Sequence, residues 1–281
     1  RFWANGAAFR AGAVTWGDGT TGIVGPVSTA NSLYGTSSYD YVGFRGAVAL
    51  TNGNYVVQSD GWNGSRGAAT WGDGANGTVG AVSALNSVGG VNPGDWLSFN
   101  GGFSGITALD NGDYLIGYLG WDDGVTSNVG AIRLLDGTMA SSGVFDATNS
   151  LVGSSTGDLN NYYVVGLGNG NFVIQSSYWD NGAAVDAGAI TFVNGATGIN
   201  GVIGSATSLV GSTSFDRIGA DYNFLSDNFY IIRNSYWDNG LAEDAGAITF
   251  MDITTGITGD INSSNSLIGS SDRKSTRLNS S

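Results

Sequence analysis

Short apolar runs that end at turn-forming residues make up most of the chain. The run at residues 162–167 is followed by a Gly-Asn-Gly turn and by a second apolar run at 171–177. Asn-Gly between two apolar runs is the strongest local signal for a β-hairpin, because both positions tolerate a positive φ. Further runs follow after a loop and a turn, at 188–193, 199–204 and 208–210. The first four of these runs are near the typical strand length of ~5–6 residues, and the short run at 208–210 closes the repeat. No 3.6-residue period persists, so the pattern predicts strands and almost no helix.

The same pattern recurs along the chain. Residues 178–192 return almost letter for letter at 236–250, an offset of 58 residues, and weaker copies precede them. One tryptophan of each copy falls in a common column, which contains Trp3, Trp62, Trp121, Trp179 and Trp237. A period of this size indicates a supersecondary unit that is used several times. We divide the chain into repeats 1 to 5, at residues 1–41 (a partial repeat), 42–96, 97–158, 159–216 and 217–271.

Four short strands per repeat and one large aromatic side chain per repeat favour a β-propeller. Propeller blades run ~40–50 residues in the commoner families, and a repeat of 58 residues is a plausible long blade. A β-helix coil is much shorter, and an immunoglobulin-like domain needs ~100 residues. The sequence therefore predicts an all-β chain of about five four-stranded antiparallel blades, forming either a complete ring or an arc of a larger one.

Composition removes several classes of function. The chain has 281 residues, with 48 Gly, 2 Pro, no Cys and no His. Disulfides, Cys or His metal sites and Ser-His-Asp triads are therefore excluded. The net charge of −13 argues against nucleic acid and anionic membrane surfaces as partners. No apolar run approaches the ~20 residues that span a bilayer, so membrane insertion is not predicted.

The repeats resemble a known class of β-propeller repeats. The residues that carry the resemblance are Val42-Gly43, the run at 46–50, the Asn-Gly hairpin, the Trp-Asp-Asn-Gly loop and the Gly-Ala-Ile-Thr-Phe strand. In this pattern, which covers roughly residues 1–271, the chain is similar to FG-GAP repeats, the blades of integrin-like propellers. It resembles still more closely the tandem repeats of large secreted bacterial adhesins of the filamentous haemagglutinin type. The resemblance implies an extracellular or cell-surface location. One departure is that no copy of the Asp-x-Asp-x-Asp-Gly calcium loop of integrin-like blades is present.

The last ten residues, 272–281, differ from the rest. They contain Lys274, the only lysine of the chain, and they break the repeat. They resemble the translation of a sequencing adapter, and we exclude them from the fold as a non-native tail. Because the chain also begins at Arg1 rather than Met, we expect truncation at both ends.

The Trp-Asp-Asn-Gly loops are the first candidate site. Sugars are commonly held by stacking on an aromatic face and by hydrogen bonds to Asp and Asn. The candidate ligand-binding residues are Trp121, Asp122, Trp179, Asp180, Trp237 and Asp238. The alternative is that each tryptophan packs between neighbouring sheets while Asp and Asn close a turn on their own backbone. Recurrence of the tryptophan in every repeat favours this structural alternative.

Two pairs of aspartates could bind Ca²⁺, which takes 6–8 oxygen ligands. The pairs are Asp180 with Asp186 and Asp238 with Asp244, each six residues apart. Earlier repeats have Arg10, Arg66 and Asn128 at the second position, so the pair is not a requirement of the repeat. We expect solvated turn carboxylates and no resident cofactor, with calcium as the alternative. Four further aspartates each precede a strand and are expected to act in turns: Asp40, Asp95, Asp158 and Asp216.

An enzyme is the most distant of the alternatives. Asp122 and Asp123 are adjacent, so in a strand they would point to opposite faces and could not share a site. The irregular junction at 89–103, with Trp96, is the place where an active site would depart from the repeat. The sequence therefore favours a non-catalytic extracellular repeat region of a bacterial surface or secreted protein, which contacts a cell-surface glycan or protein through loops. A glycan-binding lectin propeller and a carbohydrate-active enzyme are the rival interpretations.

Overall fold

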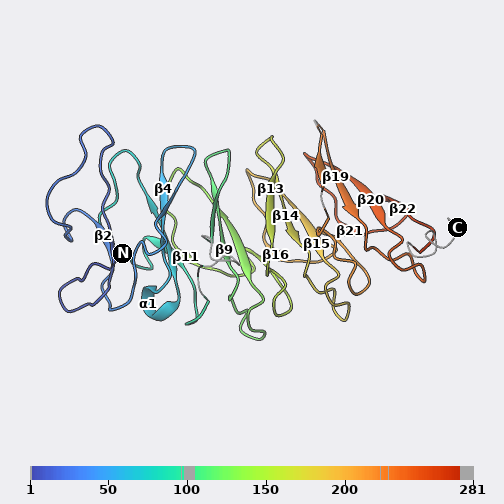
Figure 1. The fold of residues 1–281 in the computed structure, drawn as a ribbon, viewed down its shortest axis with the longest axis horizontal. Coiled ribbons are helices and arrows are strands. Elements are labelled where there is room, and N and C mark those ends of the chain that lie inside the picture. The colour runs from blue at the N-terminus through green and yellow to red at the C-terminus, as the bar shows by residue number, and fades with distance from the viewer. Residues whose placement is uncertain (1, 96, 98–104, 222, 227, 273–281) are drawn as a thin grey trace, which may run out of the picture. The chain divides into compact units, whose positions relative to one another are not determined.

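The described part of the chain consists of short strands joined by turns (Figure 1). The structure is a computed structural model, and it describes residues 2–95, 97, 105–221, 223–226 and 228–272. The one helical segment among these residues is α1 (Trp62–Ser65), in which Asn63 and Gly64 have φ of 53° and 72°, so that it is a turn rather than a regular helix. The prediction of an all-β chain is confirmed. No described helical segment has the length and apolarity to cross a bilayer.

The chain divides into two compact units, Arg1–Ser150 and Leu151–Ser281. The first unit contains β1 (Ala13–Val14), β2 (Leu33–Tyr34), β3 (Ala47–Ala49), β4 (Tyr55–Ser59), β5 (Ala68–Gly72), β6 (Gly80–Ala81), β7 (Ser87–Gly89), β8 (Ile106–Ala108), β9 (Tyr114–Tyr118), β10 (Ala131–Leu135) and β11 (Gly143–Val144). The second contains β12 (Leu151–Val152), β13 (Tyr163–Gly166), β14 (Phe172–Ser176), β15 (Ala189–Val193), β16 (Gly201–Val202), β17 (Leu209–Val210), β18 (Phe224–Leu225), β19 (Phe229–Asn234), β20 (Ala247–Asp252), β21 (Gly259–Asp260) and β22 (Ser266–Ile268).

Repeat 4 shows how one sheet is built. Strands β13, β14, β15 and β17 pair in that order, and all three pairings are antiparallel, as the hairpin pattern predicts. The fifth strand, β21, is parallel to β17 and belongs to repeat 5. The same parallel pairing joins β2 to β6, β7 to β11 and β12 to β16. One strand in each of repeats 1 to 4 (β2, β7, β12 and β17) therefore pairs with a two-residue strand of the following repeat.

This strand exchange corrects one detail of the prediction. The run at 199–204 is counted in the sequence among the antiparallel strands of its own repeat, but β16 is parallel to β12 and pairs with that strand of the preceding repeat. The local pattern identifies a strand, whereas the partner of a parallel strand lies far away in the sequence and leaves no local signal. Within each unit the described sheets follow chain order and do not close into a ring, so a closed propeller is not found.

Apolar side chains of successive repeats pack against each other to form the core. In the second unit, Ile190 and Leu209 of repeat 4 share a buried cluster with Tyr230, Ile232 and Trp237 of repeat 5. In the first unit, Trp62 of repeat 2 packs against a cluster that includes residues of repeat 1. Full burial of a Leu or Ile side chain contributes about 1.5–3 kcal/mol. These contacts place Trp62 and Trp237 between repeats, as the structural alternative expected of the tryptophan column.

Side-chain hydrogen bonds that recur at the same position fix the turns. Asn86 Oδ1 accepts from Ser83 N at 2.9 Å, and its amide nitrogen donates to the Ala81 carbonyl at 2.9 Å. Asn31 makes the matching bonds with Ser28 and Pro26 in repeat 1. Asn side chains that bond their own neighbouring backbone are a standard turn device. The Asn-Ser-Leu column is therefore a turn signature of the repeat.

Candidate functional site

The four aspartates that precede a strand act as clamps between segments. Asp158 is fully buried, and its Oδ2 accepts from the backbone N–H of Ser154 at 2.6 Å and of Ser155 at 2.7 Å. Its Oδ1 accepts from Asp180 N in the Trp-Asp-Asn-Gly loop at 3.1 Å. Burial raises the pKa of the Asp158 carboxyl, and the backbone N–H donors oppose that rise.

The same arrangement recurs at the other three aspartates. Asp216 accepts from Ser212 N, Thr213 N and Asp238 N at 2.8, 2.9 and 3.0 Å. Asp40 and Asp95 also accept two backbone N–H groups of the preceding turn on Oδ2. The predicted turn role of these aspartates is confirmed, with the addition that Asp40, Asp158 and Asp216 also hold a distant loop.

The Trp-Asp-Asn-Gly loops use their polar side chains to close on themselves. Asp180 Oδ1 accepts from Asp186 N at 2.8 Å, and Asn181 Nδ2 donates to the Gly211 carbonyl at 2.8 Å. Asp238 and Asn239 make the matching bonds in repeat 5 at 2.7 and 2.8 Å. Asp122 Oδ1 accepts from Asn128 N at 2.6 Å. The aspartates stabilise the loop conformation by bonding its backbone, and Asn181 and Asn239 tie their loops to the glycines that follow β17 and β22.

The indole rings of these loops are enclosed by protein. Trp121, Trp179 and Trp237 are 6%, 3% and 4% exposed. A sugar that stacks on an aromatic ring needs an accessible face, and these rings present little of one. The aromatic surface available to a ligand lies elsewhere.

The aspartate pairs proposed for calcium are also engaged with the protein. Asp186 has φ of 52° and pairs with Arg217, whose NH2 lies 3.3 Å from its Oδ2. Asp244 occupies the matching place with φ of 50°. Over the described residues there is no group of three or more acidic, His or Cys side chains that could hold a metal ion. Parts of the earlier predictions lie outside the described residues: Trp96, residues 98–103 of the junction at 89–103, and the tail from residue 273.

An open groove of about 760 Å³ lies in the second unit. Strands β13 and β14 supply Tyr163 and Gln175, the following loop supplies Tyr178, and the segment at 219–223 supplies Asp221 and Asn223. Tyr163 is 60% exposed and Tyr178 is 39% exposed, so both phenol rings face solvent. At the base, Gln175 donates to the hydroxyl of Tyr230, and burial raises the pKa of Tyr230. The groove therefore combines exposed aromatic rings with carboxamide and carboxylate groups.

An arginine lies between two exposed aromatic rings beside this groove. The guanidinium carbon of Arg217 is 5.8 Å from the ring centre of Tyr178 and 5.8 Å from that of Phe215. Arginine within ~6 Å of an aromatic face is attracted to it. We name Tyr178, Phe215 and Arg217 the second aromatic–arginine cluster, because another such cluster, described next, comes earlier in the chain.

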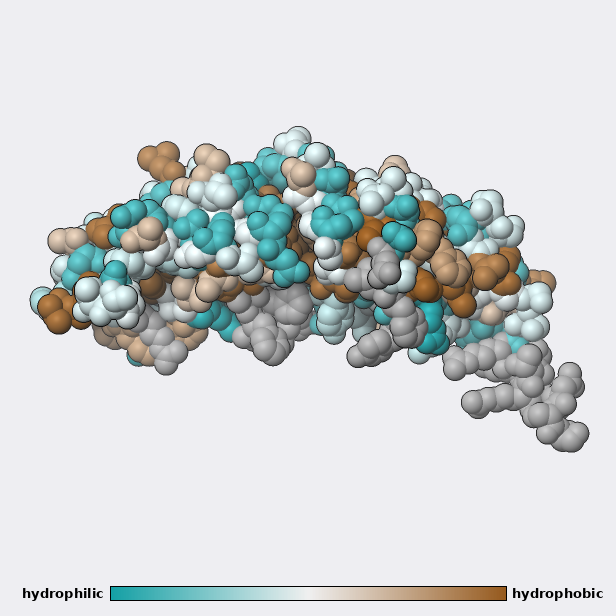
Figure 2. Space-filling model, turned by 90° about the horizontal axis from the view of Figure 1, so that it is seen from above, coloured by the Kyte–Doolittle hydropathy of each residue, from teal (hydrophilic) through white to brown (hydrophobic). Residues whose placement is uncertain are grey.

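Repeat 1 carries a counterpart in the first unit. The guanidinium carbon of Arg10 lies 5.3 Å from the ring centre of Phe2 and 5.1 Å from that of Phe9. The ring of Tyr39 contacts those of Phe9 and Tyr41, with centres 5.8 and 5.9 Å apart. We name Phe2, Phe9, Arg10, Tyr39 and Tyr41 the first aromatic–arginine cluster. Hydrophobic residues reach the molecular surface between hydrophilic ones (Figure 2), and Phe2, Phe9 and Tyr39 are each about half exposed.

Comparison with protein families gives the repeat its assignment. A family model described as a repeat of unknown function (DUF5650) matches residues 1–44, 49–98, 108–161, 166–220 and 224–277. The chain belongs to the DUF5650 family. The matches identify no FG-GAP or adhesin family. No curated protein matches the chain.

The features shared by the DUF5650 repeats are the structural ones. The clamp aspartates, the Asn turns and the loop tryptophans recur from repeat to repeat, and each bonds or packs within the protein. The aromatic–arginine clusters are found in some repeats and not in others: the residues that precede Asp95 and Asp158 are Gly94 and Gly157, where repeats 1 and 4 have Tyr39 and Phe215. Sequence reasoning missed Tyr163, Tyr178 and Phe215. Tyr178 recurs as Tyr236 beside the loop tryptophan, and Phe215 stands where repeats 2 and 3 have glycine, so both left a signal in the sequence.

Proposed function

We propose that this chain is a non-catalytic repeat region of an extracellular bacterial surface or secreted protein, and that it works in adhesion by holding a cell-surface glycan. The groove of the second unit would receive the glycan, with Tyr163 and Tyr178 stacking on sugar rings. The observation that carries the proposal is the coincidence of these two exposed rings with polar side chains in one groove of about 760 Å³.

The chemistry of the groove suits a carbohydrate better than an apolar ligand. A sugar presents a weakly apolar ring face and a rim of hydroxyl groups, so it needs an aromatic platform and hydrogen-bonding groups together. Tyr163 and Tyr178 supply the platform, while Gln175, Asp221 and Asn223 also line the groove. The volume is within the range of about 300–1,000 Å³ that small-molecule sites occupy.

The clamps support a structural rather than a chemical use of the acidic residues. The carboxylates of Asp158 and Asp216 each accept three backbone N–H bonds, which leaves them little capacity to act on a substrate. Asp180 and Asp238 accept from their own loops. This use of carboxylates supports a binding protein over a carbohydrate-active enzyme.

The test is binding of the full chain to an array of cell-surface glycans, followed by titration calorimetry with the strongest ligand. We expect Tyr163→Ala and Tyr178→Ala each to weaken binding by at least tenfold, because each removes one stacking face. Tyr236→Ala is the matched control, since Tyr236 has the same place in repeat 5 as Tyr178, is 42% exposed and does not line the groove. Binding that is unchanged in both groove variants, or turnover of a polysaccharide by the chain, would overturn the proposal.

A further inference from the structure

The groove of the second unit has an acidic lining. Among its described lining residues, Asp221 carries the one ionisable group that is charged at neutral pH. The neutral lining residues include Tyr163 and Tyr178, whose rings are exposed. The whole chain has a net charge of −13, so the field around the groove also attracts cations. The groove is therefore suited to a ligand that carries a positive charge.

The charge of Asp221 is not balanced by a neighbouring arginine. Arg217 lies beside the ring of Tyr178, but its NH2 is 3.3 Å from Oδ2 of Asp186, and that ion pair cancels its charge locally. Asp221 forms no ion pair with any residue in the described part of the chain. A cation that enters the groove would therefore meet an uncompensated carboxylate.

Two hydrogen bonds hold the segment that carries Asp221 against the following strand. Asp221 Oδ2 accepts from Ser235 N, directly after β19, at 2.5 Å, and Asn223 Oδ1 accepts from Arg233 N of β19 at 2.9 Å. The other oxygen of Asp221, Oδ1, makes no hydrogen bond with the described residues. The carboxylate is thus fixed in place by one oxygen and has the second available to a ligand. A group that is held in advance loses less entropy on binding.

The same segment passes close to the strand pair that carries the exposed ring. Gly219 has φ of 94°, and a Cβ atom at this position would lie 3.3 Å from Cβ of Gln175 on β14. Gln175 is paired with Tyr163 across β14 and β13. This close approach brings the loop of Asp221 beside the strands of Tyr163, and both residues line the groove.

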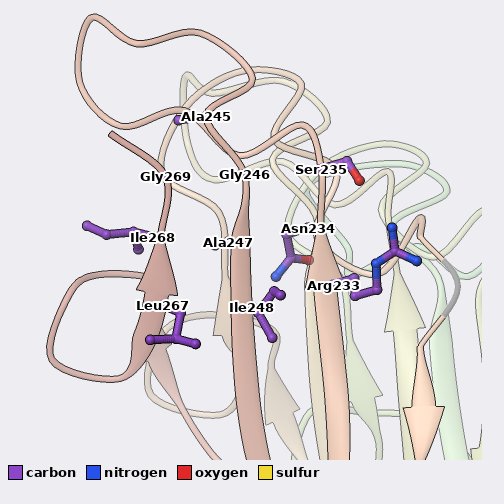
Figure 3. A pocket seen from close by; sticks show the side chains of 10 residues that line it. All are labelled: Arg233, Asn234, Ser235, Ala245, Gly246, Ala247, Ile248, Leu267, Ile268 and Gly269. Carbon is purple, nitrogen blue, oxygen red and sulfur yellow. The ribbon is translucent and has the colours of Figure 1, made fainter. Parts of the chain in front are cut away.

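The hollow in repeat 5 shows that this combination is not a general property of the sheet faces (Figure 3). The hollow has a volume of about 390 Å³, and the charged residue among those that line it is Arg233. Its described lining includes Ile248 and Leu267 but no aromatic side chain. It therefore offers neither a ring for stacking nor an acid for a cation.

A carboxylate beside exposed aromatic rings is a binding site for an ammonium group. Cations are attracted to the face of an aromatic ring, and hydrogen bonds between an ammonium and a carboxylate are strengthened by their charges. Among neutral and charged sugars, the ones that carry an ammonium group are amino sugars without an N-acetyl group. Such a sugar also keeps a ring face that can stack on tyrosine.

We propose that the groove selects glycans that contain unacetylated amino sugars, with the ammonium group bound by Asp221 Oδ1 and the sugar ring stacked on Tyr163. This inference rests on the proposed function, because it names the class of glycan that the same groove binds. Glycans with carboxylate or sulfate groups are disfavoured, since Asp221 repels them.

Titration calorimetry of the full chain with two matched tetrasaccharides tests the inference. The ligands are a tetramer of glucosamine and the corresponding tetramer of N-acetylglucosamine, which lacks the positive charges. At mildly acidic pH and low ionic strength we expect the glucosamine tetramer to bind at least tenfold more tightly, and high salt to reduce this difference. Asp221→Asn should weaken binding of the glucosamine tetramer at least tenfold and leave binding of the acetylated tetramer nearly unchanged. The amide oxygen of the variant can still accept from Ser235 N, and circular dichroism checks that the fold is kept.

Asp260→Asn is the matched control. It removes the same charge from repeat 5, while Asp260 is exposed and is not a lining residue of the groove. An equal loss of affinity in Asp260→Asn and Asp221→Asn would indicate unspecific attraction of polycations to an acidic chain and would overturn the proposal. A lysine tetramer is the third ligand. If it binds as tightly as the glucosamine tetramer and depends equally on Asp221, the groove takes a basic peptide and the proposal is overturned.

Failure of this inference can be distinguished from failure of the proposed function. If the two tetrasaccharides bind equally well and Tyr163→Ala weakens the binding of both, the preference for an amino group is refuted while glycan binding by the groove stands. If neither tetrasaccharide binds, the inference is refuted as well, and the glycan array decides the proposed function by itself.

Discussion

Repeats 4 and 5 contain nearly the same residues at 178–192 and 236–250, and the structure gives them the same strands and the same loop. Ile190 and Ile248 are corresponding residues of that stretch, yet the first is 0% exposed and the second is 39% exposed. Asp180 and Asp238 close their loops at 2.8 and 2.7 Å. Local hydrogen bonding is therefore a property of each repeat, while burial of the strand face is a property of the junction with the following repeat.

The largest effect should come from shortening the same side chain on the two faces. We expect Leu209→Ala to lower the free energy of unfolding by about 2–5 kcal/mol, the usual range for a buried leucine, because a cavity is left in the cluster shared by repeats 4 and 5. Leu267→Ala at the corresponding exposed position should change the free energy of unfolding by about 0.5 kcal/mol or less. Urea denaturation at a concentration where the chain is monomeric measures both.

The strand pair around these leucines provides a control. Thr191 and Ser208 share a hydrogen bond of 2.7 Å in repeat 4, and Thr249 and Ser266 share one of 2.6 Å in repeat 5. Ser208→Ala and Ser266→Ala remove the same local hydrogen bond from both sheets, so they serve as a control for changes that do not depend on burial of the strand face. Equal costs for Leu209→Ala and Leu267→Ala would mean that the face of repeat 5 is covered in solution and would contradict the comparison.

An intermediate effect is expected at the aspartate clamps that hold the loops of repeats 4 and 5, where the two clamps should behave alike. Asp158→Ala and Asp216→Ala each remove the acceptor of three backbone N–H groups. We expect each variant to lose about 1–3 kcal/mol of stability, the cost of leaving buried donors without a partner. Thermal unfolding followed by circular dichroism compares the two. A much larger cost for one of them would show that the clamp depends on the junction and is not a local device.

The pH dependence of the Asp158 clamp gives an independent check. Because burial raises the pKa of Asp158 above the value of 3.8 for the unfolded chain, the folded state binds more protons than the unfolded state just above pH 3.8. The contribution of Asp158 to stability is thus complete below that pH and declines as the pH rises through the raised pKa. Wild type should lose stability relative to Asp158→Asn over this interval. The opposite slope would mean that the backbone donors outweigh the burial.

The sequence was sufficient for the features that are local to one repeat. Apolar runs and Asn-Gly turns located the antiparallel strands, and the recurrence of Asp158 and Asp216 before a strand indicated a turn. The exchanged strands could not be paired in this way. Strand β16 has two residues, Gly201–Val202, and it pairs with Leu151–Val152 some fifty residues earlier, so no local pattern identifies its partner.

The candidate groove could not be predicted from the sequence, for a related reason. It is lined by Tyr163 and Gln175 of one repeat and by Asp221 and Asn223 of the next, so no single repeat contains the whole groove. The tryptophans were conspicuous because they recur, and two of them, Trp62 and Trp237, pack between repeats. The groove depends on which side chains two successive repeats bring together, so recurrence along the chain does not locate it.

The smallest effect concerns such a departure. Phe215 has φ of 71°, whereas Gly94 and Gly157 hold the corresponding place in repeats 2 and 3 with φ of 101° and 91°. A non-glycine residue in the left-handed region costs roughly 1–2 kcal/mol, and glycine loses more backbone entropy on folding by about 0.5–1 kcal/mol.

Phe215→Gly should therefore raise the free energy of unfolding by up to about 1 kcal/mol, while Phe215→Ala, which keeps the strain and loses the ring, should not raise it. Urea denaturation of the two variants side by side measures the difference. If the second aromatic–arginine cluster contributes to ligand binding, both variants should also bind the glycan more weakly than the wild type. Ligand binding would then explain why the chain has a strained phenylalanine at position 215 that does not stabilise the fold. A Phe215→Gly chain less stable than the wild type would show instead that the ring stabilises the fold through its contact with Arg217.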